Sequence, residues 1–304
     1  RGDNRRLAGE DLRRGQPALS AGRLLTPAAL GLLASLGLRT VPVVRRLRVA
    51  YFSTGDEILS LGDAPREGAV YDSNRYTVFG LLRRLGCEVI DLGVVRDDPA
   101  QLEAAFTGAA ARADAIITSG GVSVGEADHT RMMMKQLGDV AFWRIAMRPG
   151  RPMAVGRIGK SSRFAAGPPQ GETAPSGGSE PRGAGSVGAI LFGLPGNPVA
   201  VMVTFLAFVR PALLRMMGAS AEPLPRLKAH SQEAIRKKPG RTEYQRGIVS
   251  TGAGGSLQVR TTGNQGSGVL SSMVQANGLI VLPHEGGDVA VGDEVEVMMF
   301  DGVI

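Results

Sequence analysis

One stretch of the sequence combines a glycine turn with an acid at a spacing that suits the binding of an anion. Residues 114–118 are the apolar end of a predicted strand, Gly120 and Gly121 follow closely, and Asp128 stands just ahead of a helical pattern. Adjacent glycines let a backbone approach a ligand closely, and the amides at a helix start favour negative charge. Because two glycines alone are weak evidence, an ordinary tight turn between a strand and a helix remains the alternative.

Four other polar clusters follow predicted strands or precede a predicted helix. Ligands of open α/β sheets bind beyond the carboxyl ends of the strands, near a switch in strand order. We therefore expect all five clusters to share one site at a rim of the sheet. The four are Ser53-Thr54-Gly55-Asp56-Glu57, Arg96-Asp97-Asp98-Pro99, Arg148-Pro149-Gly150-Arg151-Pro152 and Leu194-Pro195-Gly196-Asn197-Pro198.

Each of these clusters, taken alone, also has a purely structural interpretation. The alternatives are a helix N-cap for Asp97 or Asp98, a solvated loop acid for Glu57, surface salt bridges for Arg148 or Arg151, and a simple turn for residues 195–198. Five such clusters at one predicted rim are hard to assign wholly to chance, and this coincidence favours a shared site.

The side chains of the predicted rim combine hard oxygen ligands with planar cations. Glu57, Asp97 and Asp128 offer oxygen atoms suited to Mg²⁺, which binds one or two carboxylates and leaves room for phosphate and water. Arg148 and Arg151 offer guanidinium groups that suit oxyanions. The sequence therefore predicts metal-assisted chemistry on a phosphate-like anion.

The elements that would position this rim alternate between strands and helices from residue 45 onward. Such alternation predicts a three-layer α/β domain with a mostly parallel sheet between helices. The predicted strands are residues 47–52, 89–95, 114–118, 140–147, 152–157 and 189–194, and the predicted helices are residues 73–86, 99–111, 130–137 and 198–217. Short strands predict a small all-β barrel-like domain after this, at residues 244–250, 257–262, 279–282 and 294–297.

This pattern predicts three parts of the chain. Residues 1–44 hold one helix that starts near Thr26, which is too little for a core, so we interpret them as the remnant of an N-terminal linker domain. Residues 45–218 form the α/β domain with a flexible insertion at 159–188, and residues 219–304 form the C-terminal β domain. The chain does not begin with Met, and we expect it to be part of a longer protein.

The composition narrows the range of partners. A net charge of +7 favours an anionic partner, whereas 5% aromatic residues with no interleaved basic run make nucleic acid the weaker option. The single cysteine, Cys87, excludes an intrachain disulfide and predicts a small buried thiol. We find no signal peptide and expect no apolar run long enough to span a bilayer, so we expect no membrane partner and a cytoplasmic location.

Taken together, the motifs resemble the molybdopterin molybdenumtransferase family, the molybdenum-inserting enzymes of molybdenum cofactor biosynthesis, which are related to the E domain of gephyrin. The resemblance covers nearly the whole chain, and several long motifs in order make it specific. Besides the five clusters above, which include Ser119 to Asp128, it rests on Tyr71-Asp72-Ser73-Asn74, Gly240-Arg241-Thr242-Glu243-Tyr244, Gln265-Gly266-Ser267 and Ser271-Ser272.

The resemblance implies a transferase that takes adenylylated molybdopterin and molybdate, inserts molybdenum at the dithiolene and releases AMP with help from Mg²⁺. It implies that Glu57, Asp97 and Asp128 are catalytic and hold the cation or position molybdate. It further implies a homodimer whose site lies between subunits, and hand-over of substrate from molybdopterin adenylyltransferase. The substrate-binding residues that it implies are Gly120, Gly121, Ser123, Arg144, Arg148, Arg151, Pro195, Asn197, Pro198, Ser267 and Ser271.

Two other functions stay open at this point. Molybdopterin adenylyltransferase resembles the middle domain, but it does not need a domain after residue 219, and its loop usually reads Gly-Gly-Thr-Gly. A scaffold role like that of gephyrin uses the same domains to bind a receptor loop, and the sequence neither supports nor excludes it. The family also carries a domain inserted near the N-terminus, which these residues lack.

Overall fold

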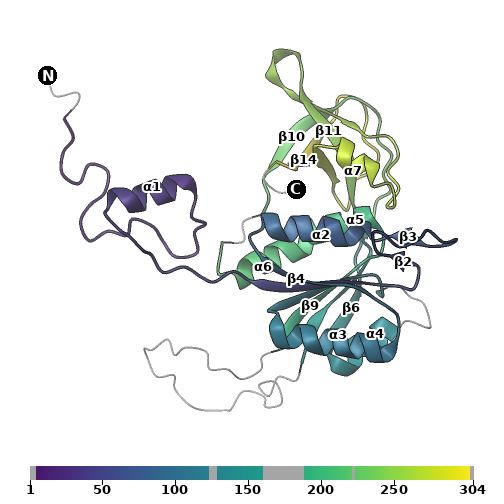
Figure 1. Cartoon of the computed structure of the whole chain (residues 1–304). Helices are drawn as coiled ribbons and strands as arrows, with labels where there is room; N and C mark the ends of the chain where they lie inside the picture. Colours follow the sequence, from purple (N-terminus) through teal and green to yellow (C-terminus); the bar gives the residue numbers. More distant parts are fainter. Residues whose placement is uncertain (1–4, 123–128, 160–187, 221–222, 302–304) are drawn as a thin grey trace, which may run out of the picture.

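The central element is a six-stranded sheet, described here from a computed structural model that covers residues 5–122, 129–159, 188–220 and 223–301 (Figure 1). Its strand order is β4-β1-β5-β9-β8-β6, in which the first four strands are parallel. The last two pairings, β9 with β8 and β8 with β6, are antiparallel. The strands are β1 (Arg48–Thr54), β4 (Glu88–Val95), β5 (Ala115–Ser119), β6 (Gly138–Arg144), β8 (Pro152–Ile158) and β9 (Ala189–Leu194).

Helices cover both faces of this sheet, because its central strands are apolar on both sides. The core on one face joins the sheet to α2 (Ser73–Arg84) and to the helix formed by α5 (Pro198–Thr204), a π-helical turn (Phe205–Val209) and α6 (Arg210–Met216). The core on the other face joins it to α3 (Pro99–Arg112) and α4 (His129–Leu137) (Figure 1). The predicted three-layer α/β fold is therefore confirmed.

The second domain is a small barrel. Strands β12-β10-β14-β13-β11 pair in that order, and an additional pairing between β11 and β12 closes the circle. This confirms the predicted barrel-like β domain. The elements are β10 (Arg226–Ser231), β11 (Thr242–Thr251), a 3₁₀ turn (Ala253–Gly255), β12 (Leu257–Thr261), α7 (Ser271–Gln275), β13 (Gly278–Leu282) and β14 (Glu294–Met299).

A short strand ties the two domains together, and it corrects one sequence-based expectation. The predicted strand 140–147 ends at Arg144 as β6, and β7 (Met147–Arg148) pairs instead with β11 of the barrel. The Ile145 N–H donates to the Arg151 carbonyl and closes the loop between β6 and β8, which carries β7. The apolar core beneath α5 also includes barrel residues such as Met273 and Val281, so the domains share one core. A second small pairing, β2 (Ile58–Leu59) with β3 (Val70–Tyr71), was not predicted.

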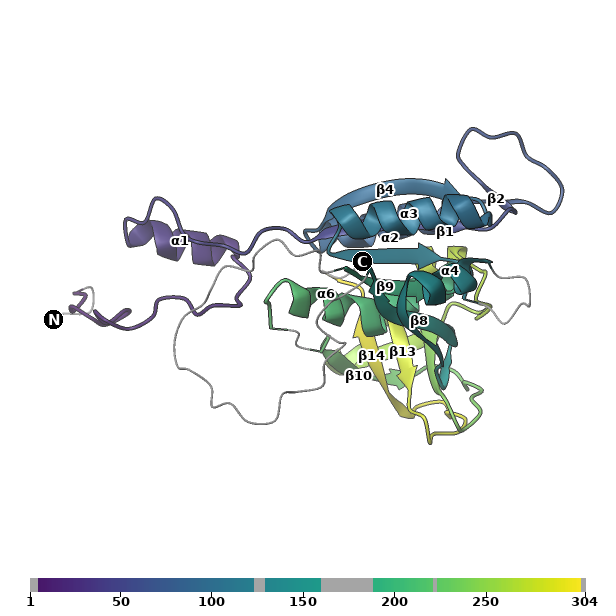
Figure 2. The ribbon, with the colours of Figure 1, turned by 90° about the horizontal axis from the view of Figure 1, so that it is seen from below.

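Residues 5–44 extend away from both domains (Figures 1 and 2). Helix α1 (Pro27–Ser35) begins where the sequence predicts, with the Thr26 hydroxyl accepting from the Ala29 N–H, yet none of its residues is buried. The leucines of this segment are largely exposed, Leu24 at 84%. The division into three parts, with its two boundaries, remains a prediction, and residues 160–187 of the predicted insertion lie outside the described chain.

The helix that runs through α5 and α6 differs from the expectation that no apolar run is long enough to span a bilayer. Over Pro198–Met216 it is long and apolar enough to cross a membrane, by length and composition alone. However, 56% of that apolar stretch is buried inside the molecule, between the sheet and the barrel (Figure 1). The helix is therefore a core element in this fold.

Candidate anion-binding active site

The five polar clusters lie at one edge of the sheet. Strands β1, β4, β5 and β9 are parallel, and two antiparallel pairings in succession give β6 the same direction. Their carboxyl ends are Thr54, Val95, Ser119, Leu194 and Arg144, and each cluster begins at or near one of these residues. The topology thus gathers the predicted rim, as the rule for open α/β sheets leads one to expect.

The glycine turn after β5 is held against its neighbours. Both glycines have positive φ, 92° at Gly120 and 63° at Gly121. A Cβ on Gly120 would lie 2.5 Å from the Thr54 carbonyl oxygen, and one on Gly121 would lie 2.4 Å from Thr130. Only glycine fits here, both for packing and for conformation. Ser123 and Asp128, also predicted site residues, lie outside the described residues.

The two described acids of the predicted metal site occupy neighbouring loops. Asp97 accepts hydrogen bonds at Oδ1 from the N–H and the hydroxyl of Thr130, each at 3.2 Å, and so joins its loop to the start of α4. Glu57 folds back on its own turn, with Oε2 2.6 Å from the position of a Cβ on Gly55. Among the described residues, no three His, Cys, Asp or Glu side chains cluster as a metal site.

A buried polar network supports the rim from below. The Tyr51 hydroxyl lies 2.8 Å from Ser53 Oγ and 2.7 Å from Ser119 Oγ, and Ser53 Oγ donates to Asp72 Oδ1 at 2.9 Å. Asp72 is also the N-cap of α2, and its Oδ2 has no partner in the described structure. Burial raises the pKa of the Asp72 carboxyl, and burial likewise raises the pKa of the Tyr51 phenol.

The loop before α5 is tied to both domains. The Asn74 side-chain amide donates to the Gly196 carbonyl at 2.7 Å, and the Val199 N–H donates to the Ser267 carbonyl at 3.1 Å. Asn197 stands at the N-cap of α5 but makes no side-chain capping hydrogen bond, and Pro198 is the first residue of the helix. The side chain of Asn197 is therefore not used for capping, which leaves it available to a ligand.

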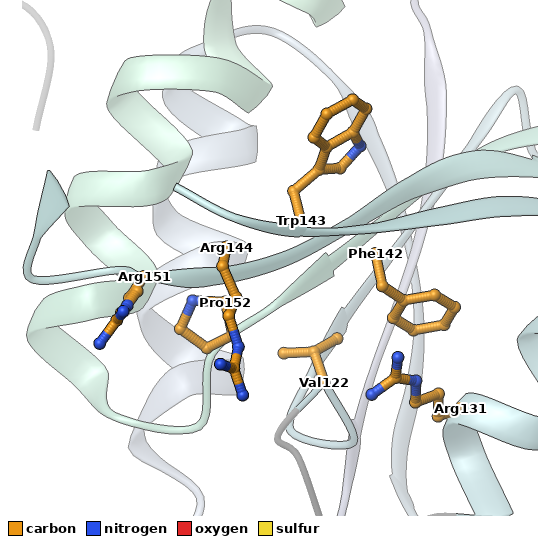
Figure 3. A pocket seen from close by; sticks show the side chains of 7 residues that line it. All are labelled: Val122, Arg131, Phe142, Trp143, Arg144, Arg151 and Pro152. Atoms are coloured by element: carbon orange, nitrogen blue, oxygen red, sulfur yellow. The ribbon is translucent and has the colours of Figure 1, made fainter. Parts of the chain in front are cut away.

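A cavity of about 380 Å³ opens beside the glycine turn. We call it the arginine cavity, because its lining combines three guanidinium groups with largely apolar side chains (Figure 3): Arg131, Arg144, Arg151, Val122, Phe142, Trp143 and Pro152. Arg144 ends β6 and pairs in register with Pro152, the first residue of β8, so Arg151, which directly precedes Pro152, lies close to Arg144. Arg131, in the first turn of α4, was not predicted, although its place just after the glycine loop was a signal for it.

The barrel supplies one more cation to this edge, which the sequence analysis missed. Arg246 is 1% exposed, and its guanidinium donates to Ser272 Oγ at 2.9 Å and to the carbonyls of Asn264 and Gly266. All of these acceptors are uncharged. Burial, and then the nearby charge of Arg148, lowers the pKa of Arg246 to about 10. A charged residue in the middle of a predicted strand was the signal that could have found it.

Arg246 and Arg148 line a small cleft where the two domains meet, of about 20 Å³. Glu243 also lines it, but its carboxylate accepts from Arg241 at 2.7 Å. The cleft therefore presents two cations whose charge no described carboxylate balances. Ser271, predicted as a contact, is the exposed first residue of α7, whereas its neighbour Ser272 is buried against Arg246.

Comparison with known proteins accounts for both domains. Residues 50–215 match a family model described as a probable molybdopterin binding domain, and residues 228–300 match the MoeA C-terminal region, domain IV. The molybdopterin molybdenumtransferase of Haemophilus influenzae is 39% identical over 302 residues, covering 99% of this chain and 68% of that protein. The chain belongs to the molybdopterin molybdenumtransferase family. The resemblance seen in its motifs is thus confirmed, and the family's members are transferases of molybdenum cofactor biosynthesis.

Other relatives agree with this assignment. Molybdopterin molybdenumtransferase 2 of Mycobacterium tuberculosis is 34% identical, covering 97% of this chain and 67% of that protein. The crystal structure of the molybdopterin biosynthesis MoeA protein from Pyrococcus horikoshii superposes with a TM-score of 0.72 at 28% identity, covering 96% of this chain and 64% of that one. The chain of this molybdenumtransferase family member thus spans about two thirds of the length of these relatives.

Proposed function

We propose that this chain transfers molybdenum from molybdate into adenylylated molybdopterin and releases AMP. The observation that carries the proposal is the buried guanidinium of Arg246, which has only uncharged acceptors and stands near Arg148 where the domains meet. A buried charge without a counter-charge is costly, so the site favours an anion. Molybdate is a compact dianion. Because the cleft is narrow, we expect molybdate to bind at its opening, between Arg148 and Arg246.

The other substrate-binding residues follow from their place on the rim. The turn at Gly120 and Gly121 lets a phosphate approach the backbone, and Arg144 and Arg151 offer guanidinium groups beside it. The loop before α5 borders the molybdate end, because Asn74 and Ser267 hold it against both domains. The further contacts that we propose there are Pro195, Asn197, Pro198, Ser267 and Ser271, with Ser123 at the glycine loop.

Mg²⁺ is the divalent cation that we propose for the reaction, held by Glu57, Asp97 and Asp128. Thr130 engages only Oδ1 of Asp97, which leaves Oδ2 for a metal. One or two carboxylates completed by substrate oxygens and water suit Mg²⁺, so the lack of a cluster of three acids among the described residues is compatible with it. When bound, the ion supplies positive charge to the phosphate oxygens.

We further propose a cytoplasmic homodimer that receives its substrate from molybdopterin adenylyltransferase. The exposed leucines of residues 5–44 support an assembly, since such a segment gains little from packing on its own chain. The alternative functions, adenylyl transfer or a scaffold role, have no specific observation in their favour. The barrel, which adenylyl transfer does not need, contributes Arg246 to the rim.

The full-length protein tests this proposal when it is supplied with adenylylated molybdopterin, molybdate and Mg²⁺. We expect molybdate-dependent release of AMP and a product that activates a cofactor-free molybdenum enzyme. If neither AMP nor active cofactor forms, the proposal is wrong. Asp128→Ala should keep the melting temperature and lose turnover, and wild-type-like turnover would remove Asp128 from the mechanism.

A further inference from the structure

The arginine cavity is larger than an oxyanion requires. Its volume of about 380 Å³ lies in the range of about 300 to 1,000 Å³ that is usual for pockets holding small organic ligands. Molybdate alone would leave most of it empty. The cavity also lies beside Val122, the residue that directly follows the glycine turn. Its occupant is therefore an organic part of a ligand whose charged group lies near that turn.

Two of the cavity's cations are suited to a phosphoryl group. Arg144 and Arg151 are exposed, and neither forms an ion pair with any residue in the described part of the chain. The Ile145 N–H, next to Arg144, donates to the Arg151 carbonyl at 2.8 Å, so the backbone at the two arginines is held side by side at the base of the loop between β6 and β8. Their guanidinium groups reach the same side of the sheet edge (Figure 3). Two adjacent guanidinium groups match the hydrogen-bonding geometry of phosphoryl oxygens and carry the opposite charge.

The third cation is held in a different way. The Arg131 guanidinium lies over the ring of Phe142, 4.5 Å from its centroid, and the Lys135 ammonium lies 5.8 Å from the same centroid. Cation–π attraction fixes the guanidinium against the aromatic face. In Figure 3, Arg131 lies on the side of Val122 opposite to Arg144. A guanidinium is planar and can stack on a planar heterocycle, which the ammonium group of a lysine cannot do.

We propose that the arginine cavity binds the phosphorylated planar heterocycle at one end of the substrate, and that Arg131 is a specificity-determining residue that selects the ring. Arg144 and Arg151 hold the phosphoryl group, and Arg131 with Val122 and Pro152 contacts the heterocycle. This inference rests on the proposed function, in which both the adenylate and the pterin ends of the substrate carry such a group. The shared chemistry is a phosphate ester of a flat nitrogen heterocycle.

Trp143 provides the reporter for a test. It is the only tryptophan of the chain, it is 60% exposed, and it stands on β6 between Phe142 and Arg144 at the lining of the cavity. We would titrate the full-length protein with AMP, a pterin phosphate, adenosine and inorganic phosphate in parallel. Calorimetry would give the affinity, and Trp143 fluorescence would report binding at the cavity for the ligands that do not fluoresce.

Variants separate recognition of the ring from recognition of the phosphate. Arg131→Gln should lower the affinity for the phosphorylated heterocycle by about tenfold or more. It should change the affinity for inorganic phosphate by less than about twofold. Arg144→Gln should lower the affinity for the phosphorylated heterocycle and for inorganic phosphate alike. Arg112→Gln is the matched control, because that exposed arginine donates a hydrogen bond to the Gly108 carbonyl of its own helix α3 and does not line the cavity. Melting temperatures establish that each variant is folded.

The outcomes distinguish this inference from the proposed function. Arg131-dependent binding of AMP or of the pterin phosphate supports the inference and identifies which end of the substrate the cavity takes. If both bind Arg131→Gln as they bind the wild type, or if saturating AMP leaves Trp143 fluorescence unchanged and the pterin phosphate does not bind, the inference is wrong. Normal AMP release from adenylylated molybdopterin would then leave the proposed function intact.

Discussion

The buried guanidinium of Arg246 donates from Nε to Ser272 Oγ over 2.9 Å. The Ser272 hydroxyl in turn donates to the Val269 carbonyl at 2.6 Å, so α7 fixes the direction of the guanidinium. Two carbonyls take the other side of the group, at 3.1 and 2.9 Å. The barrel thus holds one cation in a defined orientation toward the rim of the neighbouring domain.

Ser272→Ala should raise the KM for molybdate by about tenfold with a smaller change in kcat. The reason is that Ser272 orients Arg246 and does not itself meet the substrate, and a hydrogen bond to a charged group contributes about 1.5 to 3 kcal/mol. Steady-state AMP release at varied molybdate measures this. Ser271→Ala tests the adjacent position, which we propose as a direct contact. An unchanged KM for molybdate in Ser272→Ala would contradict the role of Ser272 in orienting Arg246.

Gly120→Ala should destabilise the protein by about 2 kcal/mol or more and abolish turnover. The residue would take a φ of 92°, and its Cβ would lie 2.5 Å from a backbone oxygen, which cannot move aside as a side chain can. Chemical denaturation and AMP release measure the two effects. Gly108→Ala in α3 is the control, since a Cβ there meets nothing within 4 Å and should stabilise the helix by up to about 1 kcal/mol. Equal behaviour of the two variants would contradict the packing argument.

Most of the fold could be predicted from the sequence, because its signals are local. Strands β1 and β5 are continuous apolar runs, and α3 begins at Pro99 after an acid that caps it, Asp98, whose Oδ1 accepts from the Gln101 N–H. The boundary between β6 and β7 was not predictable in this way. Met147 looks like a continuation of the strand, and only its pairing with Thr242, far along the chain, assigns it to the barrel.

The candidate site also contains residues that local sequence signals predict and residues that they do not. The clusters at strand ends could be predicted because the carboxyl ends of parallel strands meet at one edge of the sheet. Asp97 follows β4 and Gly120 follows β5, so both lie on this rim. Arg246 was missed because a strand pattern does not reveal that a charged side chain is buried beneath a neighbouring domain. The network of Tyr51 and Asp72 was missed for a related reason, since its hydroxyls and carboxyl come from three separate elements.

Asp72→Asn should stabilise the protein at neutral pH and lose this advantage in acid. Burial raises the pKa of the Asp72 carboxyl, with Asp91 also raising it and Arg75 lowering it. Because the pKa of this carboxyl is higher in the folded than in the unfolded state, protonated Asp72 contributes stability to the folded protein. That contribution is fully present below the unfolded pKa of about 3.8 and is lost as the pH rises through the folded pKa. Asparagine keeps an oxygen for Ser53 Oγ and for the Arg75 N–H. Melting temperatures at neutral pH and near the unfolded pKa measure the difference, and an equal gain at both would contradict the assignment to Asp72.

Cys87 should resist thiol reagents in the native protein. The side chain is 1% exposed, and burial raises its pKa to about 11, so very little thiolate exists at neutral pH. A colorimetric thiol assay should give no rapid reaction until denaturant unfolds the chain, and one thiol per chain afterwards. Rapid, stoichiometric labelling of the folded protein would contradict the buried position.

We propose that Arg246 holds molybdate where the two domains meet. A molybdate titration of AMP release from adenylylated molybdopterin tests this in the full-length wild type and in Arg246→Lys. Because lysine keeps the charge but loses the guanidinium geometry, we predict that half-maximal release needs about tenfold more molybdate in the variant. Arg226→Lys, at an exposed arginine paired with Glu296 on the barrel, should match the wild type. Identical molybdate dependence in Arg246→Lys and the wild type would contradict the claim.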